Sequence, residues 1–188
     1  MASPKELIQI VSDEMGIPVE TVTVIDRWLA DAGLRTKALR GRGITPMSYQ
    51  DAANLIIAAA HNVNPKDAVD VVQKYRTLPA HSVVPDVDSG ATFLGEDFGT
   101  ALAEMLETVP RDKAAFSSNY RDENHMAVDV FMHGPKPRAA IHILRNGVWY
   151  RFHYGDPFHG GGDLERTVKF SQITLGNVGE LIAKEFHK

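Results

Sequence analysis

Residues 126–154 read MAVDVFMHGPKPRAAIHILRNGVWYRFHY. Apolar and polar side chains alternate along three parts of this stretch, and a period of two predicts strands with one buried face. Asn146-Gly147 is a strong signal for a two-residue hairpin turn, because these residue types tolerate a positive φ. The loop at residues 134–137 contains a glycine and two prolines and predicts the turn before it. The sequence therefore predicts a three-stranded antiparallel β-meander.

The two turns also set the register of the meander. A two-residue loop pairs Arg145 with Val148, and therefore His142 with Arg151. The earlier loop then places Asp129 opposite His142. One face of the sheet becomes apolar and is the predicted core face, with Val128, Val130, Ile141, Ile143, Tyr150 and Phe152.

The other face carries a polar row that is a candidate site, made of Asp129, His142, Arg151 and the neighbouring His153. A carboxylate, an imidazole and a guanidinium in reach of one another could do acid–base work or hold a phosphate. The alternative is a solvent-facing sheet with cross-strand charge pairs. The sequence supplies neither a nucleophile nor a spaced metal-ligand motif for this row. We therefore predict no catalytic residue, no metal site and no cofactor.

Helices are expected on both sides of the meander in the sequence. Residues 97–109 carry an apolar stripe at helical spacing, residues 164–173 predict a fourth strand, and Thr174 predicts the cap of a final helix. Residues 93–188 are thus predicted to form an α+β domain, an antiparallel β-meander flanked by helices. The stretch 79–92 has two prolines and no clear period, and it is predicted to be a linker.

Residues 1–78 predict an all-helical domain. Ser3, Ser48 and Asn64 are typical N-cap residues, and Gly16 and Gly33 are typical of helix ends. Between the two glycines, apolar residues recur every three or four positions, at Val22, Ile25 and Leu29. The helices of residues 48–76, which are rich in alanine, either complete this domain or form a dimer contact.

The order of these elements resembles the winged helix-turn-helix proteins that bind DNA. The resemblance covers residues 4–47 and is carried by Met15-Gly-Ile17, Thr21-Val-Thr23, Leu29-Ala-Asp-Ala-Gly-Leu34 and Arg40-Gly-Arg-Gly43. It implies a short helix at residues 18–20, a recognition helix at 21–32 and a wing at 35–44. Because the short helix would span so few residues, one continuous helix over 18–32 is the alternative. Residues 21–60 are also similar to proteins encoded by phages and prophages.

A recognition helix must bury one face and offer polar side chains on the other. With Val22, Ile25 and Leu29 buried, we expect Trp28 to pack in the core and Asp26 to face outward. Arg27 would reach guanine, and Asp26 would accept from cytosine or orient Arg27. The cations of the following segment would contact phosphates. The predicted DNA-binding residues are Thr21, Thr23, Asp26, Arg27, Arg35, Lys37, Arg40 and Arg42.

Composition narrows the class of protein. The chain has 188 residues, 44% of them hydrophobic and 23% charged, with no cysteine and a formal net charge of −4. These are ordinary globular values. The absence of cysteine excludes a disulfide framework and fits a reducing cytoplasm. The first residues lack a signal-peptide pattern, and no apolar run is long enough to span a bilayer. We expect a cytoplasmic protein with no membrane partner.

The predicted function is that of a double-stranded DNA-binding protein, a transcriptional regulator of phage or prophage type and not an enzyme. Its C-terminal domain would serve for homo-oligomerisation, for contact with a protein partner or for sensing an effector. One alternative is a small-terminase-like DNA-packaging adaptor. Another is a small hydrolase or nuclease that uses the histidine-bearing sheet face. A third is an interaction protein whose basic loop is merely solvated.

Overall fold

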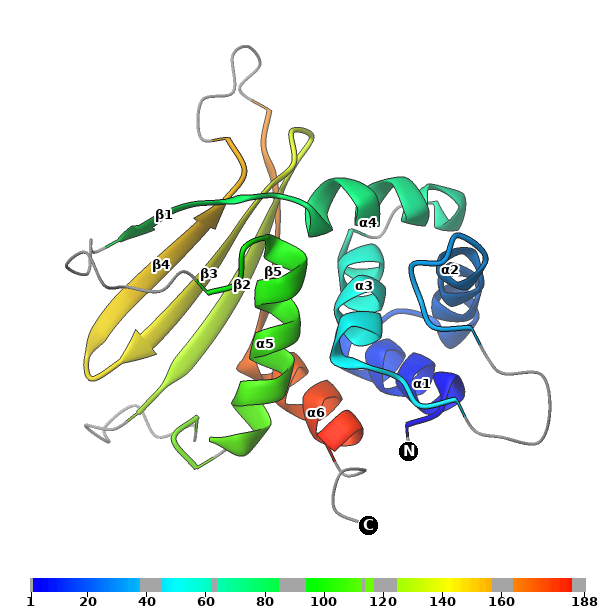
Figure 1. Ribbon diagram of the computed structural model, residues 1–188, viewed down its shortest axis with the longest axis horizontal. Coiled ribbons are helices and arrows are strands. Elements are labelled where there is room, and N and C mark those ends of the chain that lie inside the picture. Colours follow the sequence, from blue (N-terminus) through cyan, green and yellow to red (C-terminus); the bar gives the residue numbers. More distant parts are fainter. Residues whose placement is uncertain are drawn as a thin grey trace.

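The computed structural model describes residues 2–37, 45–61, 64–84, 94–112, 114–116, 125–156 and 164–183. These residues form helices and one five-stranded antiparallel sheet, which confirms the α+β class (Figure 1). The helices are α1 (Pro4–Met15), α2 (Val19–Asp31), α3 (Tyr49–Ala60), the short 3-10 helix η1 (Pro65–Asp67), α4 (Ala68–Arg76), α5 (Phe98–Arg111) and α6 (Gln172–Ala183). The strands are β1 (Ala80–Val84), β2 (Ala127–Gly134), β3 (Arg138–Arg145), β4 (Val148–Tyr154) and β5 (Arg166–Ser171).

The predicted register of the three central strands is confirmed. Asp129 lies opposite His142, which lies opposite Arg151. Asn146 and Gly147 have φ values of 51° and 73°, as a two-residue hairpin turn with both residues left-handed requires. The two hairpin turns therefore hold the predicted row of polar residues on one face of the sheet.

The outer strands depart from a simple meander. β5 pairs with β2 and β1 pairs with β4, so the strand order is β1-β4-β3-β2-β5. The prediction of a linker over 79–92 is therefore wrong for residues 80–84, which form an edge strand; residues 85–92 lie outside the described part of the chain. Thr174 does not cap the last helix either. α6 begins at Gln172, directly after β5, and Thr174 lies within its first turn.

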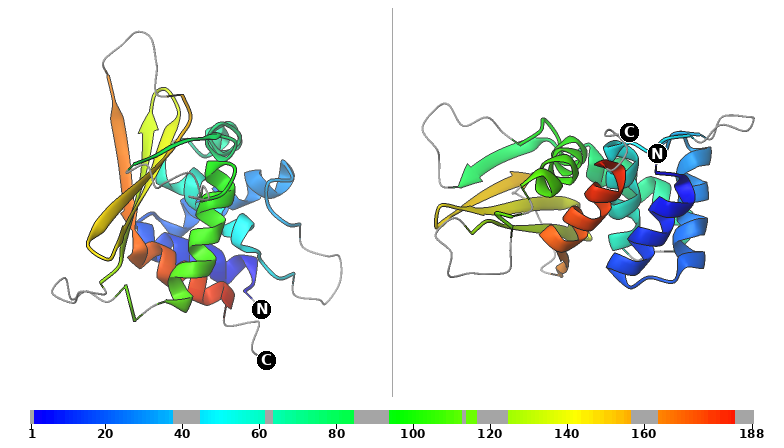
Figure 2. Two further views of the ribbon diagram at one scale, coloured as in Figure 1. Left: turned by 60° about the vertical axis from the view of Figure 1, so that its left-hand side comes forward. Right: turned by 90° about the horizontal axis from the view of Figure 1, so that it is seen from below.

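The helices gather on one side of the sheet (Figure 2). α6 packs against β2 and β5, and α5 packs against α6 and α3. The core face of the sheet is sealed by these helices, and Val128, Val130 and Ile141 are fully buried there. Among the described helices, none combines the length and apolar character needed to cross a bilayer.

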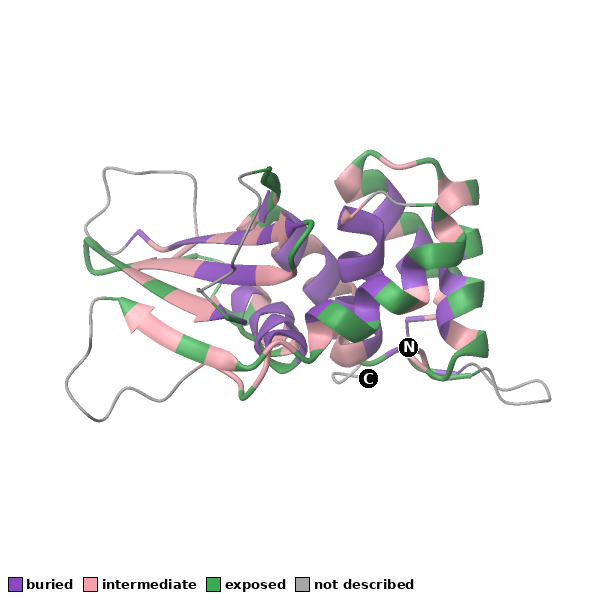
Figure 3. Ribbon diagram, turned by 90° about the horizontal axis from the view of Figure 1, so that it is seen from above, coloured by how far each residue is buried: buried purple, intermediate pink, exposed green. Residues whose placement is uncertain are grey.

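α3 is the central helix of the molecule. Every residue from Asp51 to Ala60 is buried, and the helix packs on α1, α2, α4 and α5 (Figure 3). Its alanines let the neighbouring helices approach closely. The alanines of this helix are therefore covered by the chain itself, and a dimer contact through residues 48–76 stays a prediction for α4 alone.

The N-terminal helices begin and end largely as the sequence predicts. Ser3 and Glu6 form a capping box at the start of α1, and Gly16 ends this helix with φ 63°. The stretch that follows Pro18 is one continuous helix, α2, so no separate short helix exists at residues 18–20. Most of the implied wing, residues 38–44, lies outside the described residues, and residues 35–37 are not a strand.

The helical first part of the chain and the sheet share one hydrophobic core. Polar contacts also join the first part to the rest of the chain: the Tyr75 hydroxyl donates to the His133 carbonyl of β2 at 2.7 Å, and the Asn177 amide of α6 donates to the Glu14 carboxylate at 2.8 Å. Burial raises the pKa of Tyr75 to about 12, so its hydroxyl keeps the proton that it donates. The division into domains at 1–78 and 93–188 stays a prediction. The hydrophobic core is continuous across the boundary between them.

The contact between α5 and α6 yields a stability prediction. A Cβ at Gly179 would lie 1.9 Å from the Leu106 carbonyl oxygen, whereas a Cβ at Gly176 would lie 3.7 Å from Val109. The backbone of α5 can move away from such a Cβ only at the cost of its packing. Gly179→Ala should therefore lower the free energy of unfolding by about 3 kcal/mol or more. Gly176→Ala is the matched control and should be neutral or stabilising by about 0.5–1 kcal/mol. Urea unfolding of both variants measures this, and equal stabilities would contradict the packing described.

Candidate functional site

A buried ion pair ties the segment after α2 back onto that helix. Nε and Nη2 of Arg35 lie 2.7 Å from the two carboxylate oxygens of Asp26, and the side chains are only 9% and 7% exposed. Nη1 of Arg35 donates to the Thr36 carbonyl at 2.6 Å. Burial raises the pKa of the Asp26 carboxyl, and the charge of Arg35 opposes that shift. The guanidinium is thus committed to Asp26 and to the adjacent backbone.

The same segment is held from the other side by α3. The backbone N–H of Thr36 donates to the Asp51 carboxylate at 2.7 Å, and the Asn54 amide donates to the Leu34 carbonyl at 2.6 Å. We call the five residues Asp26, Arg35, Thr36, Asp51 and Asn54 the polar clamp. The polar clamp fixes residues 34–36 between α2 and α3.

The expectation that Asp26 faces outward is therefore wrong. Positions 22, 25, 26 and 29 are spaced i, i+3, i+4 and i+7, which is one stripe of a helix, so Asp26 belongs to the buried side. The expectation that Arg35 contacts phosphate fails for the same reason, because its guanidinium nitrogens are engaged within the protein.

The outward side of α2 is instead formed by Glu20, Thr23, Val24, Arg27, Trp28 and Asp31. The structure confirms that Thr23 and Arg27 are exposed, while Thr21 is half-buried. The Thr23 hydroxyl donates to the Val19 carbonyl at 2.7 Å. The prediction that Trp28 packs in the core is wrong: its side chain is 46% exposed, one turn from Val24 at 40%. This side therefore mixes an apolar patch with one cation and two anions.

The remaining cations follow the clamp in sequence. Lys37 is exposed directly after the clamped residues. Arg40 and Arg42 lie outside the described residues. The structure thus fixes residues 34–36, where the basic segment begins, against α2 and α3. Lys37, the first of the three remaining cations, lies at the surface.

The polar row on the sheet is assembled as predicted but with a different partner for its carboxylate. Asp129 pairs with Lys169 of β5, with the two charged atoms 2.9 Å apart. The His142 ring lies 4.7 Å from that of Phe131 and 6.1 Å from that of His153, measured between ring centroids. Burial lowers the pKa of both histidines, and the positive charges nearby lower it further. Arg151 is exposed at the end of the row.

Sequence reasoning missed several side chains around this row. A cavity of about 590 Å³ joins His142 and His153 to His81 of β1 and His133 of β2. Glu165 bridges His133 and Arg138 with contacts of 2.8 and 2.9 Å. These neighbours are set by the pairing of β1 with β4 and of β5 with β2, which no local sequence pattern predicts. Within the described ranges, no group of three or more potential ligands is arranged to hold a metal ion.

Comparison of the chain with protein-family models, curated proteins and solved structures finds no match.

The polar clamp makes a testable energetic claim. Arg35→Met leaves the Asp26 carboxylate buried without its counter-charge, and breaking such a pair costs about 3–5 kcal/mol. The loss should be larger at pH 8 than at pH 5, because a carboxyl with a raised pKa in the folded state destabilises the fold as pH rises through that value. Guanidinium unfolding at the two pH values measures both effects.

The paired replacement is the control. Asp26→Leu combined with Arg35→Met removes both charges and should recover stability to within about 1–2 kcal/mol of the parent protein. A double variant as unstable as the sum of its two single variants would show that the ion pair does not act as a unit.

Proposed function

We propose that this chain binds double-stranded DNA through the outward side of α2 and the basic segment that follows it. The observation that carries the proposal is the polar clamp. It anchors residues 34–36 against α2 and α3, so that a run of cations starts beside a helix whose outer side is left open. A helix in the major groove flanked by phosphate-binding cations is a recurring arrangement for duplex recognition.

The outward side of α2 has suitable groups for contact with bases. Arg27 can donate two hydrogen bonds to guanine, and the Thr23 methyl and the Val24 side chain can contact a thymine methyl group. Trp28 adds an apolar surface whose exposure is costly in the free protein.

Electrostatics assigns the phosphate contacts to the segment beyond α2. The outward side of α2 carries Glu20 and Asp31 against Arg27, a formal balance of −1. Attraction to the DNA backbone must therefore come from Lys37, Arg40 and Arg42. Because the pair neutralises Asp26, this carboxylate adds no repulsion of its own.

The finer form of the proposal is a winged helix-turn-helix regulator of phage or prophage type in the cytoplasm. The tight turn at Gly16 between α1 and α2, and the packing of α2 on the helical core, support the helix-turn-helix part. The wing would be formed by residues 35–44. Binding as a homo-oligomer would double the phosphate contacts and match two half-sites.

Salt dependence tests the proposal. Three cations predict a slope of about −2.7 in a plot of log affinity against log salt concentration, at about −0.9 per phosphate. Arg40→Ala with Arg42→Ala should weaken binding to every sequence and flatten the slope by about two. Arg27→Ala should instead cost about 1–3 kcal/mol on preferred sequences selected from random DNA.

The matched control is Arg145→Ala with Arg151→Ala, which removes two exposed cations from the sheet and leaves the polar clamp intact. Its salt slope should equal that of the parent protein. Fluorescence anisotropy with a labelled random duplex measures all four proteins. No measurable affinity at about 50 mM salt would contradict the proposal.

A further inference from the structure

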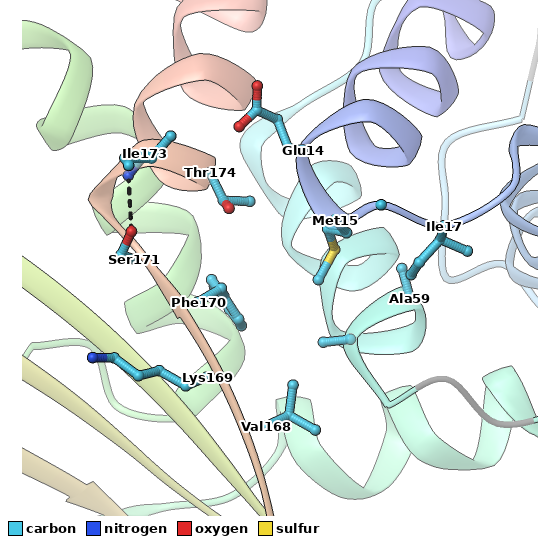
Figure 4. Close-up of a pocket in the computed structure, with 12 residues that line it drawn as sticks. Glu14, Met15, Ile17, Ala59, Val168, Lys169, Phe170, Ser171, Ile173 and Thr174 are labelled. Atoms are coloured by element: carbon cyan, nitrogen blue, oxygen red, sulfur yellow. Dashed lines mark hydrogen bonds between the residues drawn. The ribbon is translucent and has the colours of Figure 1, made fainter.

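A second cavity lies between the helical part of the chain and the sheet, away from the outward side of α2. It has a volume of about 510 Å³ and is bounded by the ends of α1 and α3, by β5 and by the first turn of α6 (Figure 4). This volume is within the range of small-molecule sites, and such sites favour junctions between packed units.

Strand alternation gives this cavity one apolar wall. Val168 and Phe170 point from β5 toward α1 and α3, whereas Lys169 between them points to the other face of the sheet (Figure 4). The Lys169 ammonium is held there by Asp129 at 2.9 Å. Met15 and Ala59 form the opposite wall, and no cationic head group among the described lining residues faces the cavity.

One polar group in the cavity lacks a partner. Thr174 is 6% exposed, and its hydroxyl makes no hydrogen bond within the part of the chain that the structure describes. Figure 4 shows this side chain directed into the space between α6 and α1. A hydroxyl can donate one hydrogen bond and accept others, so this group is available to a ligand in the cavity.

The rim of the cavity is negative. The Glu14 carboxylate accepts one hydrogen bond from Asn177 at 2.8 Å, and a carboxylate retains further acceptor sites. Both α1 and α3 end at this rim, through residues 14–16 and 59–60, with partial negative charge at their C-termini, whereas α6 begins there with partial positive charge. The full charge of the Glu14 carboxylate outweighs these partial charges. A cationic head group is thus favoured over a neutral or anionic one.

We propose that this cavity binds a small organic cation, an alkyl- or arylalkylammonium. Its apolar body lies against Val168, Phe170 and Met15, and its ammonium group donates to the Glu14 carboxylate and the Thr174 hydroxyl. The cavity shares no residue with the proposed DNA surface, so this inference stands or falls independently of the proposed function.

Titration calorimetry of the full chain with phenethylammonium tests the proposal, with 2-phenylethanol and 3-phenylpropionate as neutral and anionic probes. The ammonium compound should bind saturably and about tenfold or more tightly than the alcohol, and the carboxylate most weakly. Glu14→Gln should weaken ammonium binding about tenfold and leave the binding of the alcohol unchanged.

Asp13→Asn is the matched control, because it removes the same charge from the same helix end. The Asp13 carboxylate accepts from Gln9 at 2.9 Å and lies outside the cavity. This variant should keep the ammonium affinity within about twofold of the parent protein, since exposed charges are largely screened. The Met15 methyl resonance should shift on binding. Absence of saturable binding at about 10 mM, equal binding of ammonium and alcohol, or equal effects of the two carboxylate variants would overturn the proposal.

Discussion

The buried pair of Asp26 and Arg35 is the constraint on which the N-terminal surface depends. A carboxylate on the apolar stripe of α2 is tolerable only when its counter-charge arrives with good geometry, and Arg35 supplies it nine residues later. The chain must therefore turn at Gly33 and return along α2. That return delivers the backbone of Thr36 to Asp51 and fixes where the basic segment leaves the protein.

The buried helix α3 connects the polar clamp to the rest of the molecule. It supplies Asp51 and Asn54 to the polar clamp at one part of its surface and packs against α5 elsewhere. The outward side of α2 and the outer face of the sheet consequently lie at opposite ends of the molecule, while the cavity near Thr174 lies between them (Figures 1 and 3). The three surfaces are separate in space and can be tested separately.

The sequence predicts those interactions whose partners are close together along the chain, and it does not predict those whose partners are far apart. The row from Asp129 to Arg151 was predictable because two short turns set its register. The pairing of β5 with β2 was not, because the chain between β4 and β5 is too long to specify a neighbour. Asp26 was misplaced because polarity alone assigns a carboxylate to the surface, and only Arg35, remote in sequence, reverses that assignment. The burial of Trp28 is predicted wrongly because hydrophobicity alone assigns an aromatic residue to the core.

The most direct measurement of the central claim is a titration of the isotope-labelled protein with a random-sequence DNA duplex, followed by amide chemical shifts. DNA binding through α2 predicts that the shifts concentrate at Thr23, Arg27, Trp28 and Lys37, with the outer sheet face around His142 unchanged. Shifts confined to the sheet face, or no shifts at low salt, would contradict it.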